Sequence, residues 1–315
     1  MTRTVAFQMD PLETVKIEGD SSFALMLEAQ ARGYALYEYQ PGHLSYLDGR
    51  VRADARPVTV RREKGDHFQA GERRLIDLGA DTDVVWVRQD PPFDIAYITA
   101  CHLLERAQGQ TMVVNDPEAI RGAPEKLFVL DFADLMPPTL ITRSEAEIRE
   151  FLREHGEIVV KPLHGKGGEG VFRIGADAQN LSSLVQLFRQ ELKEPFIAQA
   201  FLPAVSEGDK RVILVDGEPI GAINRVPAKG EFRSNMVVGG SAVATELSDR
   251  DREICAAIGP ELKRRGLLFV GIDVIGGLMT EINVTSPTGL VALDRFDDIN
   301  SAGLVWDAIE RKLAA

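Results

Sequence analysis

Three oxygen-bearing side chains, Asp273, Glu281 and Asn283, lie in two apolar segments that flank a glycine turn at Gly276-Gly277. Glu281 and Asn283 are two residues apart, so in a strand their side chains leave the same face. Magnesium favours such hard oxygen ligands, usually taking one or two carboxylates and leaving its other positions to water and phosphates. The pattern therefore predicts a magnesium site on a β-hairpin, with a solvated hairpin carrying ordinary edge charges as the alternative.

This prediction depends on the register of the hairpin. Asp273 faces Glu281 directly if the turn has an odd number of residues centred on Gly277. A two-residue turn at Gly276-Gly277 instead pairs Asp273 with Thr280 and sends Glu281 to the other face. The residues leave both registers open.

A second group of residues could bind phosphate. Lys161 lies within the apolar run 158–163, and a lysine inside a buried strand needs an anionic partner. Residues 164–170 then read His-Gly-Lys-Gly-Gly-Glu-Gly, and a glycine-rich hairpin between strands lets backbone N–H groups surround phosphate oxygens. Neither the Walker nor the Rossmann pattern is present. A flexible hairpin tip is the alternative, and it would not explain the lysine.

Three arginines, Arg211, Arg225 and Arg233, fall on or beside neighbouring expected elements and could gather around a highly charged reaction centre. Scattered surface arginines are the alternative. Residues 196–202 predict a strand that could form the apolar wall of a nucleobase site. Residues 232–242, which include Arg233, predict a mobile loop.

Arg88 follows the buried strand expected at residues 84–87, where a guanidinium is well placed to bind a carboxylate. Two prolines stiffen the loop 88–94 that it begins. The alternative is a rigid turn in which Arg88 and Asp90 pair with each other.

The N-terminal residues predict a small α/β domain. A strand at 4–9, an N-cap at Asp20-Ser21-Ser22, a helix at 23–32 and a strand at 34–39 favour a parallel sheet. Ligands of such sheets lie beyond the carboxyl ends of the strands, here near Met9-Asp10 and residues 20–22.

The rest of the chain predicts further elements in order. The expected strands are residues 112–114, 139–142, 158–163, 171–174, 212–215 and 220–226. The expected helices are a short one carrying Lys126 and residues 145–155, 181–192, 248–265 and 298–313, with a Ser144–Glu147 capping box on the second.

Composition limits the classes of function. The 315 residues suggest two or three domains of about 100–150 residues each. A net charge of −12 argues against nucleic acid or an anionic membrane as the main partner, and no membrane span or signal peptide is expected. Cys101 and Cys255 lack metal spacing, which favours reduced thiols and a cytoplasmic protein.

Several residue runs resemble those of one known family, the bacterial glutathione synthetases of the ATP-grasp superfamily, and the resemblance runs nearly end to end. The runs are Gln8-Met9-Asp10-Pro11, Asp20-Ser21-Ser22-Phe23-Ala24, Leu27-Glu28-Ala29-Gln30, Asp90-Pro91-Pro92-Phe93-Asp94, Glu125-Lys126-Leu127-Phe128, Lys161-Pro162-Leu163, Gly208-Asp209-Lys210-Arg211 and Thr280-Glu281-Ile282-Asn283-Val284-Thr285-Ser286-Pro287-Thr288.

The resemblance implies an α/β ATP-grasp fold in three parts. Residues 1–122 would form an N-terminal α/β substrate domain, 123–203 a central lid, and 204–315 a C-terminal catalytic subdomain. It further implies a homo-oligomer and small-molecule substrates. The implied reaction phosphorylates the carboxylate of γ-glutamylcysteine with ATP, after which the amine of glycine attacks the acyl phosphate.

The resemblance also assigns roles to residues. ATP would contact Lys126, Lys161, Gly165, Gly167, Gly168, Gln199, Ala200, Phe201, Leu202 and, at the ribose, Asp209. Asp273, Glu281 and Asn283 would bind magnesium, with manganese as an alternative. The other substrates would meet Asp20, Ser21, Arg88, Asp90, Ser286 and Thr288, while Arg211, with Arg225 and Arg233, would stabilise the reacting charges.

Two runs depart from the family pattern. Gly239-Gly240 is followed by Ser241-Ala242-Val243 where the family has an arginine, a small residue and an acid, and Leu290-Val291-Ala292 replaces Ile-Arg-Glu. Arginine is the usual fork for a carboxylate, so these losses leave a second hypothesis, a related ligase with a different acid or amine. A non-catalytic nucleotide-binding module is a third.

Overall fold

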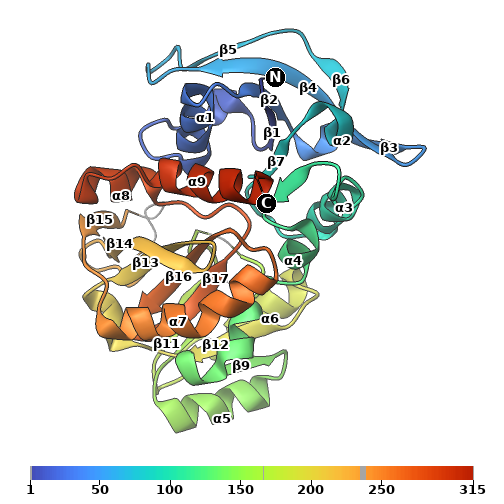
Figure 1. Cartoon of the computed structure of the whole chain (residues 1–315). Coiled ribbons are helices and arrows are strands. Elements are labelled where there is room, and N and C mark those ends of the chain that lie inside the picture. Colours follow the sequence, from blue (N-terminus) through green and yellow to red (C-terminus); the bar gives the residue numbers. More distant parts are fainter. Residues whose placement is uncertain (1, 166, 235–238, 315) are drawn as a thin grey trace.

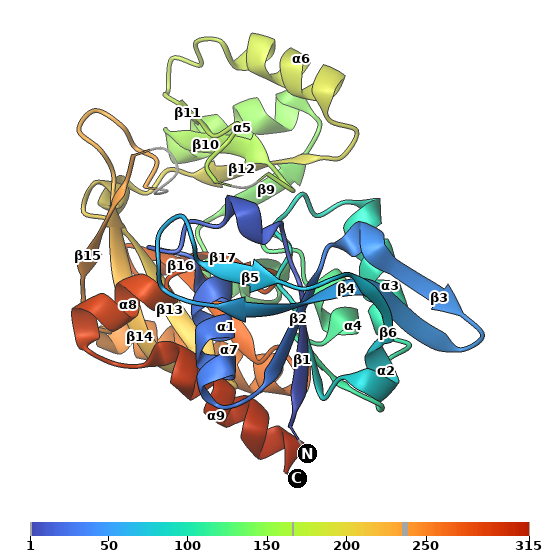
Figure 2. The same cartoon turned by 90° about the horizontal axis from the view of Figure 1, so that it is seen from above.

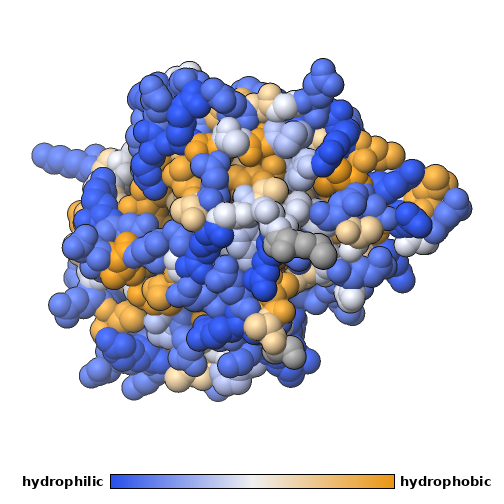
Figure 3. Space-filling model, turned by 45° about the horizontal axis from the view of Figure 1, so that its top comes forward, coloured by the Kyte–Doolittle hydropathy of each residue, from blue (hydrophilic) through white to orange (hydrophobic). Residues whose placement is uncertain are grey.

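The described residues of this computed structural model, 2–165, 167–234 and 239–314, form three β-sheets with helices packed around them (Figure 1). The face in Figure 3 is mostly hydrophilic, with smaller hydrophobic areas between, as a chain of net charge −12 leads one to expect. No helix in the described ranges has the length and apolar content needed to cross a membrane.

The N-terminal sheet has the strand order β3-β4-β2-β1-β7-β8, with β5 and β6 also paired to β4. Its strands are β1 (Thr4–Gln8), β2 (Ala35–Tyr39), β3 (Leu44–Leu47), β4 (Arg50–Val60), β5 (Phe68–Ala70), β6 (Arg74–Asp77), β7 (Val84–Val87) and β8 (Met112–Val114). Strands β2, β1, β7 and β8 run parallel, which confirms the expected α/β arrangement. The antiparallel strands β3 to β6 were not predicted.

Short helical segments connect these strands. They are η1 (Leu12–Thr14), α1 (Ser21–Ala31), η2 (Pro41–His43), α2 (Leu78–Asp81), α3 (Ile95–Leu104) and α4 (Pro117–Arg121). The Asp20 carboxylate accepts a hydrogen bond from the Phe23 N–H at 2.7 Å, so Asp20 is the N-cap that the sequence predicted for α1.

The central unit is an antiparallel sheet in the order β11-β10-β12-β9. Its elements are β9 (Thr139–Thr142), α5 (Glu145–His155), β10 (Ile158–Pro162), β11 (Phe172–Ile174), α6 (Leu181–Glu191) and β12 (Phe196–Ala200). Its buried side chains form a separate core of residues from this unit alone. Figure 2 shows the unit set to one side of the other two sheets, as a lid would be.

The C-terminal sheet has the order β15-β14-β13-β16-β17 and is antiparallel throughout. Its elements are β13 (Asp209–Val215), β14 (Glu218–Val226), β15 (Ser241–Ala244), α7 (Asp249–Arg264), β16 (Phe269–Ile275), β17 (Leu278–Asn283), α8 (Leu290–Asp297) and α9 (Ser301–Leu313), preceded by η4 (Pro203–Ser206). Val212 and Leu214 of β13 pack with α7, whereas Ile213 and Val215 pack with α8 and α9.

Helix α9 joins the N-terminal and C-terminal sheets into one block. Trp306 is fully buried, its ring contacts those of Tyr34 and Trp86, and its Nε1 donates to the Leu25 carbonyl at 2.9 Å. Arg32, the C-cap of α1, adds ion pairs to Asp307 and Glu310 of α9 at 2.7 and 2.8 Å, although these partners lie far from it in the sequence. The two sheets therefore share a core, unlike the lid.

The sequence predicted one C-terminal helix from residue 298 and placed 290–292 in a loop, which is wrong. Leu290 begins α8 and is fully buried in the shared core together with Leu293, one turn further on. The left-handed Asp298 separates α8 from α9, which begins at Ser301.

Two expectations near the lid also differ from the structure. Lys126 lies in a turn that precedes the 3-10 helix η3 (Phe128–Leu135), because the Leu127 and Phe128 N–H groups both return to the Pro124 carbonyl at 2.9 Å. Ser144 caps α5, but the Glu147 carboxylate accepts from the Thr142 hydroxyl at 2.5 Å and does not complete a capping box.

The loop expected at residues 232–242 ends in strand β15, whose Ser241 pairs with Val226 of β14. Residues 235–238 of this loop, and Lys166 of the glycine-rich hairpin, lie outside the described residues.

Replacing Trp306 tests the shared core. Trp306→Ala should lower the free energy of unfolding by about 3–5 kcal/mol, because it leaves a cavity between the two sheets. Leu304→Ala, on the same helix but 41% exposed, should change it by less than about 0.5 kcal/mol. Urea unfolding followed by circular dichroism measures both, and equal stability of the two variants would contradict the shared core.

Candidate active site

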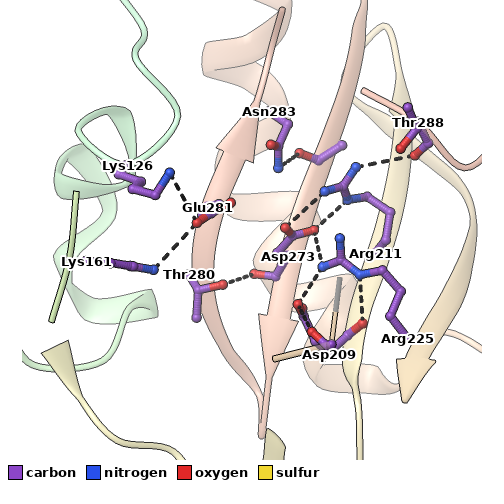
Figure 4. Close-up of polar contacts among 12 residues, drawn as sticks. Lys126, Lys161, Asp209, Arg211, Arg225, Asp273, Thr280, Glu281, Asn283 and Thr288 are labelled. Atoms are coloured by element: carbon purple, nitrogen blue, oxygen red, sulfur yellow. Dashed lines mark hydrogen bonds and ion pairs between the residues drawn. The ribbon is translucent and has the colours of Figure 1, made fainter. Parts of the chain in front are cut away.

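A cavity of about 480 Å³ lies between the lid and the C-terminal sheet. The polar side chains at its centre come from β13, β14, β16 and β17 on one side and from the lid and the Lys126 turn on the other (Figure 4). Every residue that the sequence assigned to ATP lines this cavity: Lys126, Lys161, Gly165, Gly167, Gly168, Gln199, Ala200, Phe201, Leu202 and Asp209.

The hairpin of β16 and β17 answers the question of register. Its turn is the two-residue Gly276-Gly277, since Ile275 pairs with Leu278 and Val274 with Met279. A β-bulge then takes up Thr280, whose hydroxyl donates to the Asp273 carbonyl at 3.3 Å, and Asp273 pairs with Glu281. The bulge thus places Asp273 opposite Glu281 despite the even-numbered turn.

Asp273 is held by two arginines. Its Oδ1 and Oδ2 accept from Arg211 Nε at 2.5 Å and Nη2 at 3.0 Å, and Arg225 Nη2 lies 2.9 Å from Oδ1. Burial alone would raise the pKa of Asp273, but the two guanidinium groups outweigh it and hold this pKa well below its usual range. Asp273 therefore stays a carboxylate although it is only 4% exposed.

Arg225 also bridges Asp273 to a second buried acid. Its Nη2 lies 2.6 Å from Asp209 Oδ2, which accepts from the Ser234 hydroxyl at 2.7 Å as well. Burial raises the pKa of Asp209 above its usual value. The positive charge of Arg225 lowers this pKa and the negative charge of Asp273 raises it, but the net shift is upward. Two carboxylates thus depend on one shared guanidinium.

Glu281 faces the lysines on the opposite side of the hairpin (Figure 4). Its Oε1 lies 3.5 Å from Lys126 Nζ and 3.5 Å from Lys161 Nζ, so Glu281 is the anionic partner expected for the buried Lys161. Burial would lower the pKa of Lys126, but Glu281 and Glu125 reverse the effect and raise it. Lys126 therefore stays protonated and can attract a further anion.

Asp273, Glu281 and Asn283 fit a cation with oxygen ligands. Asn283 donates its amide to the Gly271 carbonyl at 3.2 Å, and within the described residues its Oδ1 and Glu281 Oε2 have no hydrogen-bond partner. Both oxygens of Asp273 already accept from arginine, although a carboxylate has about four lone-pair positions. In the described ranges, no three His, Cys, Asp or Glu side chains are grouped so that they could hold a metal. The set of two carboxylates and one amide therefore needs phosphate or water to complete the coordination of a metal.

The glycine-rich loop closes the cavity from the lid. Gly167, Gly168 and Gly170 have φ values of 63°, 81° and 66°, a region that favours glycine. The Gly165 carbonyl accepts from Lys126 Nζ at 2.7 Å, and the Gly168 carbonyl accepts from Arg233 Nη1 at 3.3 Å. The structure therefore brings Arg211 and Arg225 together, while Arg233, from the segment after β14, contacts this loop.

An aromatic wall stands where the sequence predicted a nucleobase. Strand β12 ends at Ala200, and the next residue, Phe201, meets Phe232 edge-on with centroids 6.5 Å apart. The Arg173 guanidinium lies 4.0 Å from the Phe201 ring centroid. These groups bound an apolar end of the cavity that suits a flat ring.

The predicted substrate residues divide into two sets. Asp90, Ser286 and Thr288 line the cavity, and the Ser286 hydroxyl donates to Asp90 Oδ1 at 2.7 Å. Asp20 and Ser21 lie behind it, because Asp20 caps α1 and the Ser21 hydroxyl accepts from the Gly289 and Leu290 N–H groups at 3.1 and 3.3 Å.

Arg88 does not pair with Asp90, so the rigid-turn interpretation is wrong. Arg88 Nε donates to the Ser22 hydroxyl at 2.9 Å and Nη2 to the Pro287 carbonyl at 3.0 Å, which ties the N-terminal sheet to the segment after β17. Its Nη1 is buried and has no hydrogen-bond partner among the described residues. Burial lowers the pKa of Arg88, although the negative charges of Asp20 and Asp90 act to raise it.

Sequence reasoning missed Glu125 and Ser234. Glu125 lines the cavity, pairs with Lys126, and its carbonyl accepts from the Ile282 N–H at 3.0 Å. Its position directly before Lys126 was the available signal. The two departing runs are not part of the lining: Ser241 is exposed on β15, and Leu290 belongs to the shared core.

Family models match both halves of the chain. The model described as prokaryotic glutathione synthetase, N-terminal domain, matches residues 4–121. The model described as prokaryotic glutathione synthetase, ATP-grasp domain, matches residues 125–298.

Relatives of similar length are also known. Glutathione synthetase of Rhodopseudomonas palustris is 56% identical over 314 residues, which cover 100% of both chains. Glutathione synthetase of Agrobacterium fabrum is 56% identical over 98% of this chain and 97% of the relative, and that of Yersinia pestis is 45% identical over 97% of both.

Solved structures share the fold at low identity. D-cycloserine synthetase DcsG superposes with a TM-score of 0.70 at 17% identity, covering 98% of this chain and 99% of that one. D-alanyl-alanine synthetase A of Vibrio cholerae gives 0.64 at 13% identity over 100% of both chains.

Removing the shared guanidinium tests the Asp209–Arg225–Asp273 cluster. Arg225→Gln should lower the free energy of unfolding by about 3–5 kcal/mol, because it leaves two buried carboxylates with too little positive charge. Adding Asp209→Asn removes one of these charges and should recover part of the loss. Urea unfolding of the ligand-free variants measures both effects.

Arg233→Gln is the matched control, since its partly exposed pair with Glu231 is screened by solvent and should change the free energy of unfolding far less than Arg225→Gln does. A double variant no more stable than Arg225→Gln would contradict the assigned charge balance.

Proposed function

The chain belongs to the prokaryotic glutathione synthetase family, and from this premise we propose how its residues carry out ATP-dependent glutathione synthesis. It is a ligase that forms a carbon–nitrogen bond and uses ATP and Mg²⁺. The observation that carries the proposal is the hairpin of β16 and β17, where Asp273 lies between two arginines and the opposing Glu281 lies between two lysines.

ATP binds with its phosphates between the lysines and the glycine-rich loop. Lys126 and Lys161 supply positive charge, and Gly165, Gly167 and Gly168 allow the backbone to approach the phosphate oxygens closely. Gln199, Ala200, Phe201 and Leu202 form the adenine site, with Asp209 toward the ribose. The position of each of these residues in the cavity lining supports this assignment.

Asp273, Glu281 and Asn283 hold magnesium, with manganese as an alternative. When bound, the metal neutralises charge on the phosphate oxygens. For Asp273 to serve as a ligand it must share its oxygens with, or turn away from, Arg211 and Arg225. Such a turn would free the two guanidinium groups for substrate charge.

The reaction needs positioning and charge neutralisation and no protein nucleophile. A carboxylate oxygen of γ-glutamylcysteine attacks the terminal phosphorus of ATP, and ADP leaves. The nitrogen of glycine then attacks the carbonyl carbon of the acyl phosphate, loses a proton, and phosphate leaves as the amide forms. Arg211 donates to the oxyanion of the tetrahedral intermediate, with Arg225 beside it and Arg233 bonded to the glycine-rich loop.

γ-Glutamylcysteine binds at the side of the cavity formed by Asp90, Ser286 and Thr288. Arg88 lies behind this wall, and its Nη1, which has no hydrogen-bond partner among the described residues, is offered to a substrate carboxylate. Asp20 and Ser21 act indirectly, because they fix the helix and the backbone on which this wall rests.

Neither alternative is favoured. A related ligase with another acid or amine rested on Ser241 and Leu290-Val291-Ala292, and these residues do not line the cavity in the described structure. Relatives that are 55–56% identical over the whole chain carry the name glutathione synthetase. A non-catalytic module would not need the complete set of cations and carboxylates.

Three further assignments belong to the same proposal. The chain divides into 1–122, 123–203 and 204–315, supported by the three sheets and by the separate core of the lid from Leu140 onward. The apolar side chains of residues 123–136 pack with the C-terminal sheet, so the first part of the range 123–203 rests on that sheet. It forms a homo-oligomer, for which the exposed Tyr46, Leu47 and Leu75 on the β3–β4–β6 sheet offer an apolar contact. It is cytoplasmic, consistent with Cys101 and Cys255 as free thiols.

Phosphate release tests the function directly. With ATP, magnesium and γ-glutamylcysteine, release should depend on glycine, and mass spectrometry should identify glutathione as the product. Removing magnesium with a chelator should stop the release. Turnover only with a different acid or amine would overturn the substrate assignment while leaving the ligase mechanism.

Replacing Arg211 tests the oxyanion role. Arg211→Ala should lower kcat by about 10²–10³-fold, because the developing negative charge loses a preorganised donor. ATP binding, measured by calorimetry, should persist. Arg250→Ala is the control, since Arg250 binds the Gly277 carbonyl away from the cavity and its loss should leave kcat unchanged. Normal turnover of Arg211→Ala would remove Arg211 from the mechanism.

A further inference from the structure

An aromatic pair joins the lid to the N-terminal domain. The rings of Phe93 and His164 are stacked, with centroids 6.2 Å apart and planes 27° from parallel. Phe93 lies in the loop between β7 and α3, and His164 follows β10 of the lid. The lid has its own core, so contacts of this kind decide where it rests on the block formed by the other two sheets.

Each ring is tied to one side of the proposed active site. Phe93 lies three residues after the cavity-lining Asp90. Its ring packs on that of the buried Tyr97, with centroids 5.2 Å apart. His164 directly precedes Gly165, whose carbonyl accepts from Lys126 Nζ at 2.7 Å. The pair therefore connects the loop proposed to bind the acid substrate with the loop proposed to bind phosphate.

The two rings also close a small recess beside the main cavity. The recess has a volume of about 10 Å³, enough for roughly one water, and is lined by Pro91, Phe93, Pro124, Glu125, His164, Val284 and Thr285. Burial lowers the pKa of His164. The negative charge of Glu194 raises this pKa and the positive charge of Lys126 lowers it, so the net shift is downward. A neutral imidazole can remain in this half-buried position without losing the solvation of a charge.

We propose that Phe93 and His164 are positioning residues that couple binding of the acid substrate to binding of ATP. A substrate held by the Asp90 loop fixes Phe93, and Phe93 holds His164 and the glycine-rich loop in the position that receives the phosphates. This inference rests on the proposed function, which places γ-glutamylcysteine and ATP on these two loops.

Thermodynamic linkage gives the proposal a measurable size. If the acid substrate raises the affinity for ATP by some factor, ATP must raise the affinity for the acid substrate by the same factor. The part of this factor carried by one aromatic pair should be about two- to tenfold, the range known for such pairs in double-mutant cycles.

Calorimetry of the full chain tests the coupling. The Kd of a non-hydrolysable ATP analogue with magnesium is measured with and without saturating γ-glutamylcysteine, in the absence of glycine. Wild-type protein should bind the analogue more tightly when the acid is present. Phe93→Ala and His164→Ala should each reduce the ratio of the two Kd values by about two- to tenfold, with the Kd in the absence of acid changing less than twofold.

Matched variants separate coupling from general damage. His164→Phe keeps a ring that can stack on Phe93 and should restore the ratio. The double variant Phe93→Ala/His164→Ala should lose no more coupling than either single variant, because both remove the same contact. Ile95→Ala, two residues from Phe93 but 76% exposed, should leave the ratio unchanged.

An unchanged ratio in Phe93→Ala would overturn the proposal, as would a loss of ATP affinity that is equal with and without the acid. A wild-type ratio of one would overturn it too. None of these results affects the proposed function, which fails separately if the wild-type protein makes no glutathione in the mass-spectrometric assay.

Discussion

Two carboxylates, the buried Asp273 and the partly exposed Glu281, face each other across a hairpin, and each is held between two cations. Such an arrangement is stable only as a whole, because a charge buried without its partners loses several kcal/mol of solvation. Arg211 and Arg225 come from one pair of strands, whereas Lys126 and Lys161 come from outside that sheet. The sheet, the Lys126 turn and the lid must therefore meet at this point for the charges to balance.

The same balance explains how the site can receive a highly charged nucleotide. Lys126 keeps its proton because Glu281 and Glu125 lie beside it, and Asp273 keeps its charge because two guanidinium groups surround it. Phosphate anions can then take the place of the carboxylates beside the lysines. A divalent cation can likewise take the place of the guanidinium groups beside Asp273. The charges are present before the ligands arrive, so little reorganisation is needed during the reaction.

The distribution of cores separates what is rigid from what can move. The N-terminal and C-terminal sheets share a core around Trp306, and this core fixes the wall proposed to bind the acid substrate relative to Asp273. The lid has a separate core and meets the block through polar contacts at the cavity and through the Phe93–His164 stack. Relative motion of lid and block is thus easier than motion within the block.

The sequence by itself determined the strongly apolar elements, such as β1, β7 and β10, because apolar runs are local properties. Runs shared with a known family also supplied the ten residues assigned to ATP, all of which line the cavity. It left the hairpin register open, predicted a pairing of Arg88 with Asp90 as one alternative, and missed α8. Only the tertiary structure decided these points. The bulge at Thr280 sets the register within the hairpin, although no residue pattern there marks it. The hydrogen bond from Arg88 to Pro287 and the burial of Leu290 depend on segments distant in the chain, whose packing no local pattern records.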